Sequence, residues 1–248
     1  MALRYPDPIP WVSLLLALAA GCGVRSAELR TPRPVPRDVC VVVGLLGGFD
    51  AWDDSTKGVR RLALELRRSP GILAETFENR RSGLARAFLV EALDADRDGR
   101  VSSTEAARAR VVIYGQSLGG GAAAALARAL VRDGVEVELL LLIDSVGRRD
   151  DVAPPSVANA AVLYQDEGWF IAGEPEIRPL DPRRTRILGA WQFDYDRPPG
   201  STIPIDDLAW HESAFRIAHA RMDRDPRVWA TADSLIRAAC TEALEARG

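Results

Sequence analysis

The stretch VVIYGQSLGGG, residues 111–121, decides how the rest of the sequence is interpreted. Residues 111–114 form a short apolar run that predicts a buried strand, and the Ala-rich segment 120–131 predicts a helix. Between them, residues 115–119 match the pattern G-x-S-x-G, in which the serine stands on a sharp turn from strand to helix. The flanking glycines let the strand and the helix approach each other closely. The pattern therefore predicts that Ser117 is a nucleophile, with a Gly-rich structural turn as the alternative.

Outward from this turn, apolar strand-like runs alternate with segments of helical periodicity. Strands are expected at 39–43, 71–77, 135–143, 158–164 and 185–191, and helices at 58–68, 82–92 and 225–244. Strands that are apolar throughout, and rich in β-branched residues, are typical of a sheet buried on both faces. The alternation predicts the α/β class, a mostly parallel sheet with helices on both faces.

A serine nucleophile also needs a base and an acid, which follow a G-x-S-x-G serine in the order acid, then histidine. Asp144 ends the strand expected at 135–143, at the sheet edge where ligands bind. A surface or capping aspartate is the alternative for it. The chain has only two histidines, His211 and His219, and we favour His219 as the base.

Four stretches resemble the α/β-hydrolases, specifically their compact lipase- and thioesterase-like forms. They are VVVGLLGG at 41–48, YGQSLGG at 114–120, LIDSV at 142–146, and His219 followed by DPRVW at 225–229. The resemblance covers residues 39–240 and implies acyl transfer by Ser117, Asp144 and His219. In such relatives the acid follows the next strand after the nucleophile, and the base lies shortly before a closing helix.

The resemblance also implies an oxyanion hole made of backbone N–H groups. These are the N–H of Leu118 and one from the loop after the first strand, Leu45 or Leu46. The sequence departs from many relatives at two points. Val43-Gly44 stands where they carry His-Gly, and Ser145 follows the acid where they often carry proline.

A second motif, DADRDGRVSSTE at 94–105, matches the EF-hand calcium loop position by position. The expected ligands are the carboxylates of Asp94, Asp96 and Asp98, the Arg100 carbonyl, Ser102 through water and the Glu105 carboxylate, with Gly99 at the sharp turn. We expect Ca²⁺ here as a structural clip between the helix at 82–92 and the strand that precedes Ser117. A sensor role and a solvated acidic turn with a helix cap are the alternatives. No partner loop accompanies it.

The N-terminal segment has the features of a targeting signal. Arg4 precedes an apolar run at 10–20, which is too short to cross a membrane. The run ends in LAAGC at 18–22, which resembles the lipobox of bacterial lipoproteins and implies cleavage before Cys22 and lipidation of its thiol. An ordinary cleaved signal and a cytosolic protein are the alternatives.

These features divide the chain into a signal peptide at 1–21, a flexible Pro-rich tether at 22–37 and a hydrolase domain at 38–248. The expected location is the cell envelope, with a membrane as partner through the lipid anchor. In an oxidising compartment Cys40 and Cys240 could pair, and two separate buried thiols are the alternative.

Composition excludes several classes of function. Of the 248 residues 47% are hydrophobic and 27% charged, so the chain can form a full core and is not disordered throughout. Its formal net charge of −3 argues against a general nucleic-acid binder. Two histidines and three cysteines exclude a His/Cys-rich zinc site.

The sequence thus predicts an exported serine hydrolase that acts on small-molecule or lipid esters or thioesters. The alternative is a catalytically inactive hydrolase scaffold that serves as a calcium-binding surface lipoprotein. The aromatic residues at 169–170 and 191–193 could line an acyl pocket, although core or loop packing is the favoured interpretation.

Overall fold

A computed structural model describes residues 29–108, 110–167, 173–205 and 210–245, with only the backbone for 210–216 and 242–245. The predicted signal peptide at 1–21 and the predicted lipidation site Cys22 lie outside the described residues, as does Trp169-Phe170. Within the described residues, no helix combines the length and apolar character that crossing a bilayer requires.

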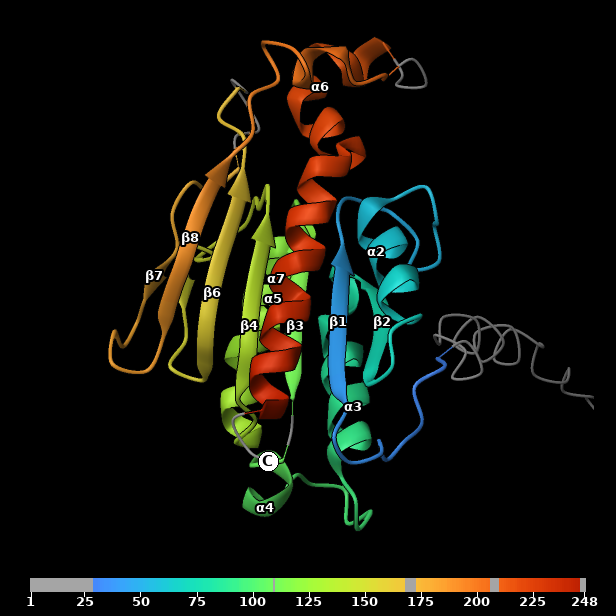
Figure 1. Ribbon diagram of the computed structural model, residues 1–248, viewed down its shortest axis with the longest axis vertical. Coiled ribbons are helices and arrows are strands. Elements are labelled where there is room, and N and C mark those ends of the chain that lie inside the picture. The colour runs from blue at the N-terminus through green and yellow to red at the C-terminus, as the bar shows by residue number, and fades with distance from the viewer. Residues whose placement is uncertain (1–28, 109, 168–172, 206–209, 246–248) are drawn as a thin grey trace, which may run out of the picture. The chain divides into compact units, whose positions relative to one another are not determined.

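A parallel sheet of six strands forms the centre of the fold, in the order β2-β1-β3-β4-β6-β8 (Figure 1). The strands are β1 (Cys40–Leu46), β2 (Ile72–Glu78), β3 (Val111–Gln116), β4 (Val137–Ile143), β6 (Val157–Tyr164) and β8 (Arg186–Gln192). Every residue of β1 and of β3 is buried, as expected for apolar strands covered on both faces. Two short strands, β5 (Val152–Ala153) and β7 (Arg178–Pro179), pair separately.

Helices cover both faces of this sheet. The helices of the fold are α2 (Gly58–Leu66), α3 (Ser82–Leu93), α4 (Ser103–Ala106), α5 (Leu118–Leu130), α6 (Trp210–Arg224) and α7 (Pro226–Glu245). Of these, α4 and α6 lie at opposite ends of the sheet (Figure 1). The helices α2 and α7 pack together with alternate residues of β1 and β3 in one core cluster, whereas α3 packs on α5 at the other face. The predicted fold class, a mostly parallel sheet with helices on both faces, is confirmed.

A disulfide joins Cys40 at the start of β1 to Cys240 in α7, with 5.6 Å between the two Cα atoms. Of the two alternatives left open by the sequence, the structure therefore has the paired one. The bond joins two cysteines 200 residues apart in the chain and ties the last helix to β1.

The segment predicted as a flexible tether, 22–37, differs from the prediction over residues 31–35. Thr31 is 5% exposed, and both its N–H and its hydroxyl donate to Glu75 Oε1, at 2.8 and 2.9 Å. The Val35 N–H donates to the Ala92 carbonyl at 2.8 Å. Because these bonds hold the segment against β2 and α3, the compact unit begins at Thr31 rather than at residue 38.

Helix α6 was not predicted: from the sequence, no element was assigned to residues 210–224, and His219 was placed just before the last helix. The segment, WHESAFRIAHARMDR, is polar overall, although its apolar residues at 210, 214, 217, 218 and 222 recur at helical spacing. His219 lies in the C-terminal half of α6, before the point where α6 gives way to α7.

Candidate active site

Ser117 stands on the sharp turn between β3 and α5. Its φ of 56° and ψ of −128° are uncommon for a residue with a side chain, so the surrounding structure must hold the turn. The glycines leave the room that this turn needs, since a Cβ on Gly119 would lie 2.0 Å from the Leu45 carbonyl oxygen. A Cβ on Gly115 would lie 2.2 Å from the carbonyl oxygen of Gly119.

Backbone hydrogen bonds fix the Ser117 turn to the adjacent strand end. The Ser117 N–H donates to the Ile143 carbonyl at 3.0 Å. The Ser117 carbonyl accepts from Gly120 at 2.9 Å and from Val146 at 3.1 Å. The ends of β3 and β4 therefore form one rigid unit at the carboxyl edge of the sheet.

Asp144 and His219 meet at this same edge. Asp144 directly follows β4, is fully buried, and has a φ of 44°. Its Oδ2 lies 2.6 Å from Nδ1 of His219, whose side chain is 16% exposed. With a proton on Nδ1, the imidazole donates to the carboxylate and its Nε2 keeps a lone pair for accepting a proton. Residues 75 positions apart are thus brought into one hydrogen bond.

The third member of the predicted set is not hydrogen-bonded to the other two. Among the residues that the structure describes, no hydrogen bond joins the Ser117 hydroxyl to His219. Hydrogen bonds of this kind often tighten only when substrate binds. The side chain of His211, the other histidine, lies outside the described residues.

Gln165 also lies at the site, although the sequence analysis did not identify it as a functional residue. Its side chain is fully buried, and its Nε2 donates to Oδ1 and Oδ2 of Asp144 at 3.2 and 3.4 Å. A signal for it exists: Gln165 directly follows β6, the neighbour of β4, so parallel pairing brings both residues to one edge. Gly173 closes over the same carboxylate, because a Cβ there would lie 2.3 Å from Asp144 Oδ1.

The loop after β1 lies beside Ser117. A Cβ on Gly47 would be 2.9 Å from the Ser117 Cβ, and Asn79 Nδ2 holds this loop by donating to the carbonyls of Leu46 (3.1 Å) and Gly48 (2.6 Å). Leu45 itself lies inside β1, paired with Phe77 and with Gly115. The pairing of β1 with β3 ends there, whereas Leu46 is the last residue of the strand.

Leu118, the other predicted oxyanion donor, is the first residue of α5. The first N–H groups of a helix have no acceptor within the helix, and they carry the positive end of its dipole. The N–H of Leu118 is therefore suited to a developing negative charge next to Ser117.

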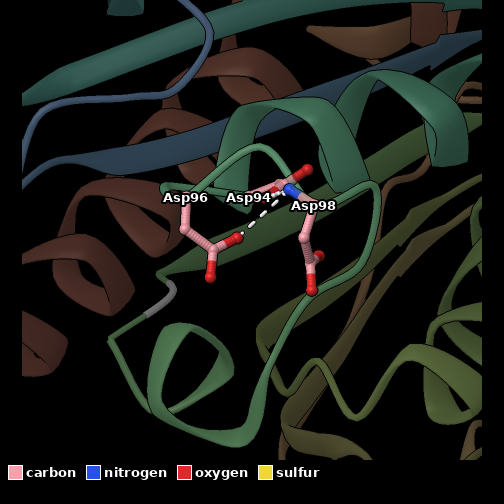
Figure 2. Close-up of side chains that lie close together, drawn as sticks. All are labelled: Asp94, Asp96 and Asp98. Atoms are coloured by element: carbon pink, nitrogen blue, oxygen red, sulfur yellow. Dashed lines mark hydrogen bonds between the residues drawn. The ribbon is translucent and has the colours of Figure 1, made fainter.

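The predicted calcium loop lies between α3 and α4. Figure 2 shows the side chains of Asp94, Asp96 and Asp98 close together, and one carboxylate oxygen of each lies within 4.8 Å of the others. Asp94 is buried, and its oxygens accept from the N–H groups of Asp98 at 3.1 Å and Gly99 at 2.8 Å. The other two carboxylates are exposed.

Glu105 is not part of this group of carboxylates. Its Oε2 accepts from the N–H and the hydroxyl of Ser102, at 2.8 and 2.7 Å, in a capping box at the start of α4. Its Oε1 accepts from the N–H of Ala95 at 2.6 Å and, more weakly, of Asp96. These hydrogen bonds, led by those from Ser102, lower the pKa of Glu105 from 4.5 to about 2.

Comparison with known proteins adds similarity of fold only. No protein-family model matches the sequence, and no curated protein matches it either. Among solved structures, alpha/beta hydrolase domain-containing protein 10 from mouse is 12% identical with a TM-score of 0.39, the match covering 65% of this chain and 84% of that one.

Two further structures are similar at the same level. An S-formylglutathione hydrolase from Agrobacterium tumefaciens is 11% identical, covering 67% of this chain and 81% of that chain, with a TM-score of 0.35. RedJ, solved with a polyethylene glycol molecule in its active site, is 12% identical, covering 68% and 87%, with a TM-score of 0.33. Similarity this low carries no argument about function.

Proposed function

We propose that this protein is a serine hydrolase that cleaves ester or thioester bonds by acyl transfer. The observation that carries the proposal is the 2.6 Å hydrogen bond between Asp144 and His219 at the edge where Ser117 stands on its strained turn. A buried carboxylate that holds an imidazole by Nδ1 is the arrangement a general base needs, because it leaves Nε2 available for the nucleophile.

The residues would act in sequence. Ser117 attacks the substrate carbonyl while His219 removes its proton, and the imidazole later returns this proton to the leaving group. Asp144 orients the ring and stabilises its charged form. The oxyanion receives hydrogen bonds from the N–H of Leu118 and from the end of β1, where the pairing favours Leu46 over Leu45.

Hydrolysis of p-nitrophenyl esters tests this proposal and separates the two histidines. His219→Gln is expected to lower kcat/KM by about 10³-fold or more, whereas His211→Gln is expected to leave it within about two-fold. Ser117→Ala gives the background rate. A wild-type rate no higher than that of Ser117→Ala would instead support the inactive, calcium-binding scaffold as the function.

Exposed apolar side chains near Ser117 favour an ester with an apolar acyl chain. Phe49 is 94% exposed just after Gly47 and Gly48, and Leu118 is 48% exposed next to the serine. An acyl chain that covers apolar side chains exposed to water at the site lowers the free energy of the complex. Phe49→Ser should therefore raise KM for octanoyl esters more than for acetyl esters, while Leu180→Ser, which removes exposed apolar surface on another loop, should change neither.

We also propose that the 94–105 loop binds Ca²⁺ as a structural clip. Three convergent carboxylates fit the oxygen donors that Ca²⁺ prefers, so Asp94, Asp96 and Asp98 would hold the ion. Glu105 would have to leave its capping box to join them. Bound ion would stabilise the folded state and supply no chemistry to Ser117.

A calcium titration of the melting temperature tests the clip. The melting temperature of the wild type is expected to rise with Ca²⁺, and that of Asp96→Asn is not. Asp181→Asn is the matched control, because Asp181 also accepts a backbone N–H two residues on, at 3.0 Å from Arg183. Equal shifts in all three proteins, or none, would overturn the proposal.

Export and lipidation at Cys22 complete the proposed function. The disulfide between Cys40 and Cys240 supports an oxidising compartment. Metabolic labelling with an alkynyl fatty acid in a bacterial host should mark the wild type and not Cys22→Ser. Equal labelling of both proteins, or none, contradicts the anchor.

A further inference from the structure

The surroundings of the Asp144 carboxylate need explanation, because a fully buried charge is costly unless hydrogen bonds satisfy it. Two described side chains supply them. His219 Nδ1 lies 2.6 Å from Oδ2, and the Gln165 amide nitrogen lies 3.2 Å from Oδ1 and 3.4 Å from Oδ2. Gly173 packs against Oδ1 and leaves no space there for a larger side chain.

The orientation of the Gln165 amide is determined by its other end. The backbone N–H of Glu167 lies 2.8 Å from Gln165 Oε1, and an N–H can only donate. The oxygen of the amide must therefore face Glu167, which leaves the nitrogen to face Asp144. Gln165 is fully buried, so bulk solvent does not reach its amide.

The contact between Gln165 and Asp144 also affects the orientation of His219. An amide nitrogen shared between both carboxylate oxygens fixes the plane of the carboxylate, and with it the direction in which Oδ2 faces His219. A donor to a carboxylate also favours its ionised form, which is the form that stabilises a charged imidazole. Within the described residues, no hydrogen bond joins Gln165 to Ser117, so its effect on the reaction would pass through Asp144.

We propose that Gln165 is a positioning residue for the Asp144–His219 pair, an inference that rests on the proposed serine hydrolase. Gln165→Met keeps an unbranched side chain and removes both the donor and the acceptor. It is expected to lower kcat by about 10- to 100-fold, as expected for hydrogen bonds to a charged group. KM should remain within about two-fold, because substrate binding is untouched.

Gln165→Glu gives a readout that a merely structural role would not produce. When protonated, the introduced carboxyl group would donate to Asp144 as the amide does. When ionised, it would repel the Asp144 carboxylate. The ratio of the kcat/KM of this variant to that of the wild type is therefore expected to fall as pH rises.

Among the described residues, the titratable groups closest to Asp144 and Gln165 include His219 from α6, Tyr195 after β8 and Glu167, whose backbone N–H bonds Gln165 and whose pKa is raised by burial. Burial, with the charges of Asp225 and Asp144, raises the pKa of Tyr195, so this phenol stays protonated throughout. Taking the ratio to the wild type at each pH removes the pH dependence that the two proteins have in common.

The rate at which a fluorophosphonate phosphonylates Ser117 separates the possible outcomes. Gln192→Met is the control for the loss of an exposed glutamine. If the wild type does not react at Ser117, the proposed function fails. If the wild type reacts and the folded Gln165→Met reacts as fast, the positioning role is wrong and the function stands. If Gln165→Met does not fold, Gln165→Glu decides: a pH-independent ratio overturns the proposal.

Discussion

The two ends of the parallel sheet carry polar groups that are organised in opposite ways. At the carboxyl edge, Ser117, Asp144 and Gln165 follow three neighbouring strands, and His219 joins them from α6. At the other end, the 94–105 loop contains all its carboxylates within twelve residues. Figure 1 places α6 and α4 at opposite ends of the sheet. The first group is buried and joined by long-range contacts, whereas the second is mostly exposed and joined by local ones.

This difference teaches how far a motif determines its own geometry. The calcium motif is the better match to a sequence pattern, yet the carboxylate at its last position serves the cap of α4. The acid and base lie in no common motif, yet they are hydrogen-bonded at 2.6 Å because the sheet and α6 bring them together. Tertiary contacts, rather than the strength of a sequence pattern, decide which side chains meet.

The largest expected effect distinguishes the two ends by activity. Asp144→Asn is expected to lower kcat/KM by about 10⁴-fold, because the imidazole loses the carboxylate that orients and stabilises it. Asp96→Asn, at the other end of the sheet, is expected to leave kcat/KM within about two-fold. Ester hydrolysis at saturating and limiting substrate measures both. Comparable losses in the two variants would mean that the loop acts on Ser117, as a sensor would.

Removal of the disulfide is expected to change stability without changing the site. The double variant Cys40→Ala/Cys240→Ala should lose about 2–5 kcal/mol of unfolding free energy, because the unfolded chain is no longer cross-linked. Cys40 lies at the start of β1, at the edge away from Ser117. Urea unfolding measures the loss, and an accompanying fall in kcat below the unfolding transition would contradict the separation of the two ends.

Two glycine variants test the packing of the Ser117 turn. Gly119→Ala should destabilise the fold by about 1–3 kcal/mol, because the new Cβ would meet the Leu45 carbonyl at 2.0 Å. Gly83→Ala in α3 meets nothing within 4 Å and should stabilise the fold by up to about 1 kcal/mol. Thermal unfolding compares them. A Gly119→Ala protein as stable as the wild type would show that the turn is loosely packed.

The smallest effect concerns the capping carboxylate of α4. Hydrogen bonds lower the pKa of Glu105 from 4.5 to about 2, so its contribution to stability is present above pH 4.5 and is lost as pH falls towards 2. The melting temperature of the wild type should exceed that of Glu105→Gln at neutral pH, and the difference should shrink over this range. A difference that is constant from about pH 6 to about pH 2.5 would contradict the capping role.

Local patterns in the sequence predicted the sheet and the Ser117 turn because those patterns have short-range causes. Apolar β-branched runs predicted the strands, and the G-x-S-x-G stretch lies where predicted, between β3 and α5. The contacts of Thr31 with Glu75 were not predicted, because a Pro-rich polar stretch does not reveal a buried partner 44 residues away. Gln165 was missed for the same reason, since its role depends on the strand beside it.

The most direct test of the central claim is to locate the site at which a fluorophosphonate attaches to the wild-type protein. The account predicts a single adduct on the peptide that contains Ser117, formed at least about 10³-fold more slowly in His219→Gln. Mass spectrometry of the digested protein reads both the position and the rate. An adduct on another residue, or equal rates in the two proteins, would show that Ser117 is not a nucleophile activated by the Asp144–His219 pair.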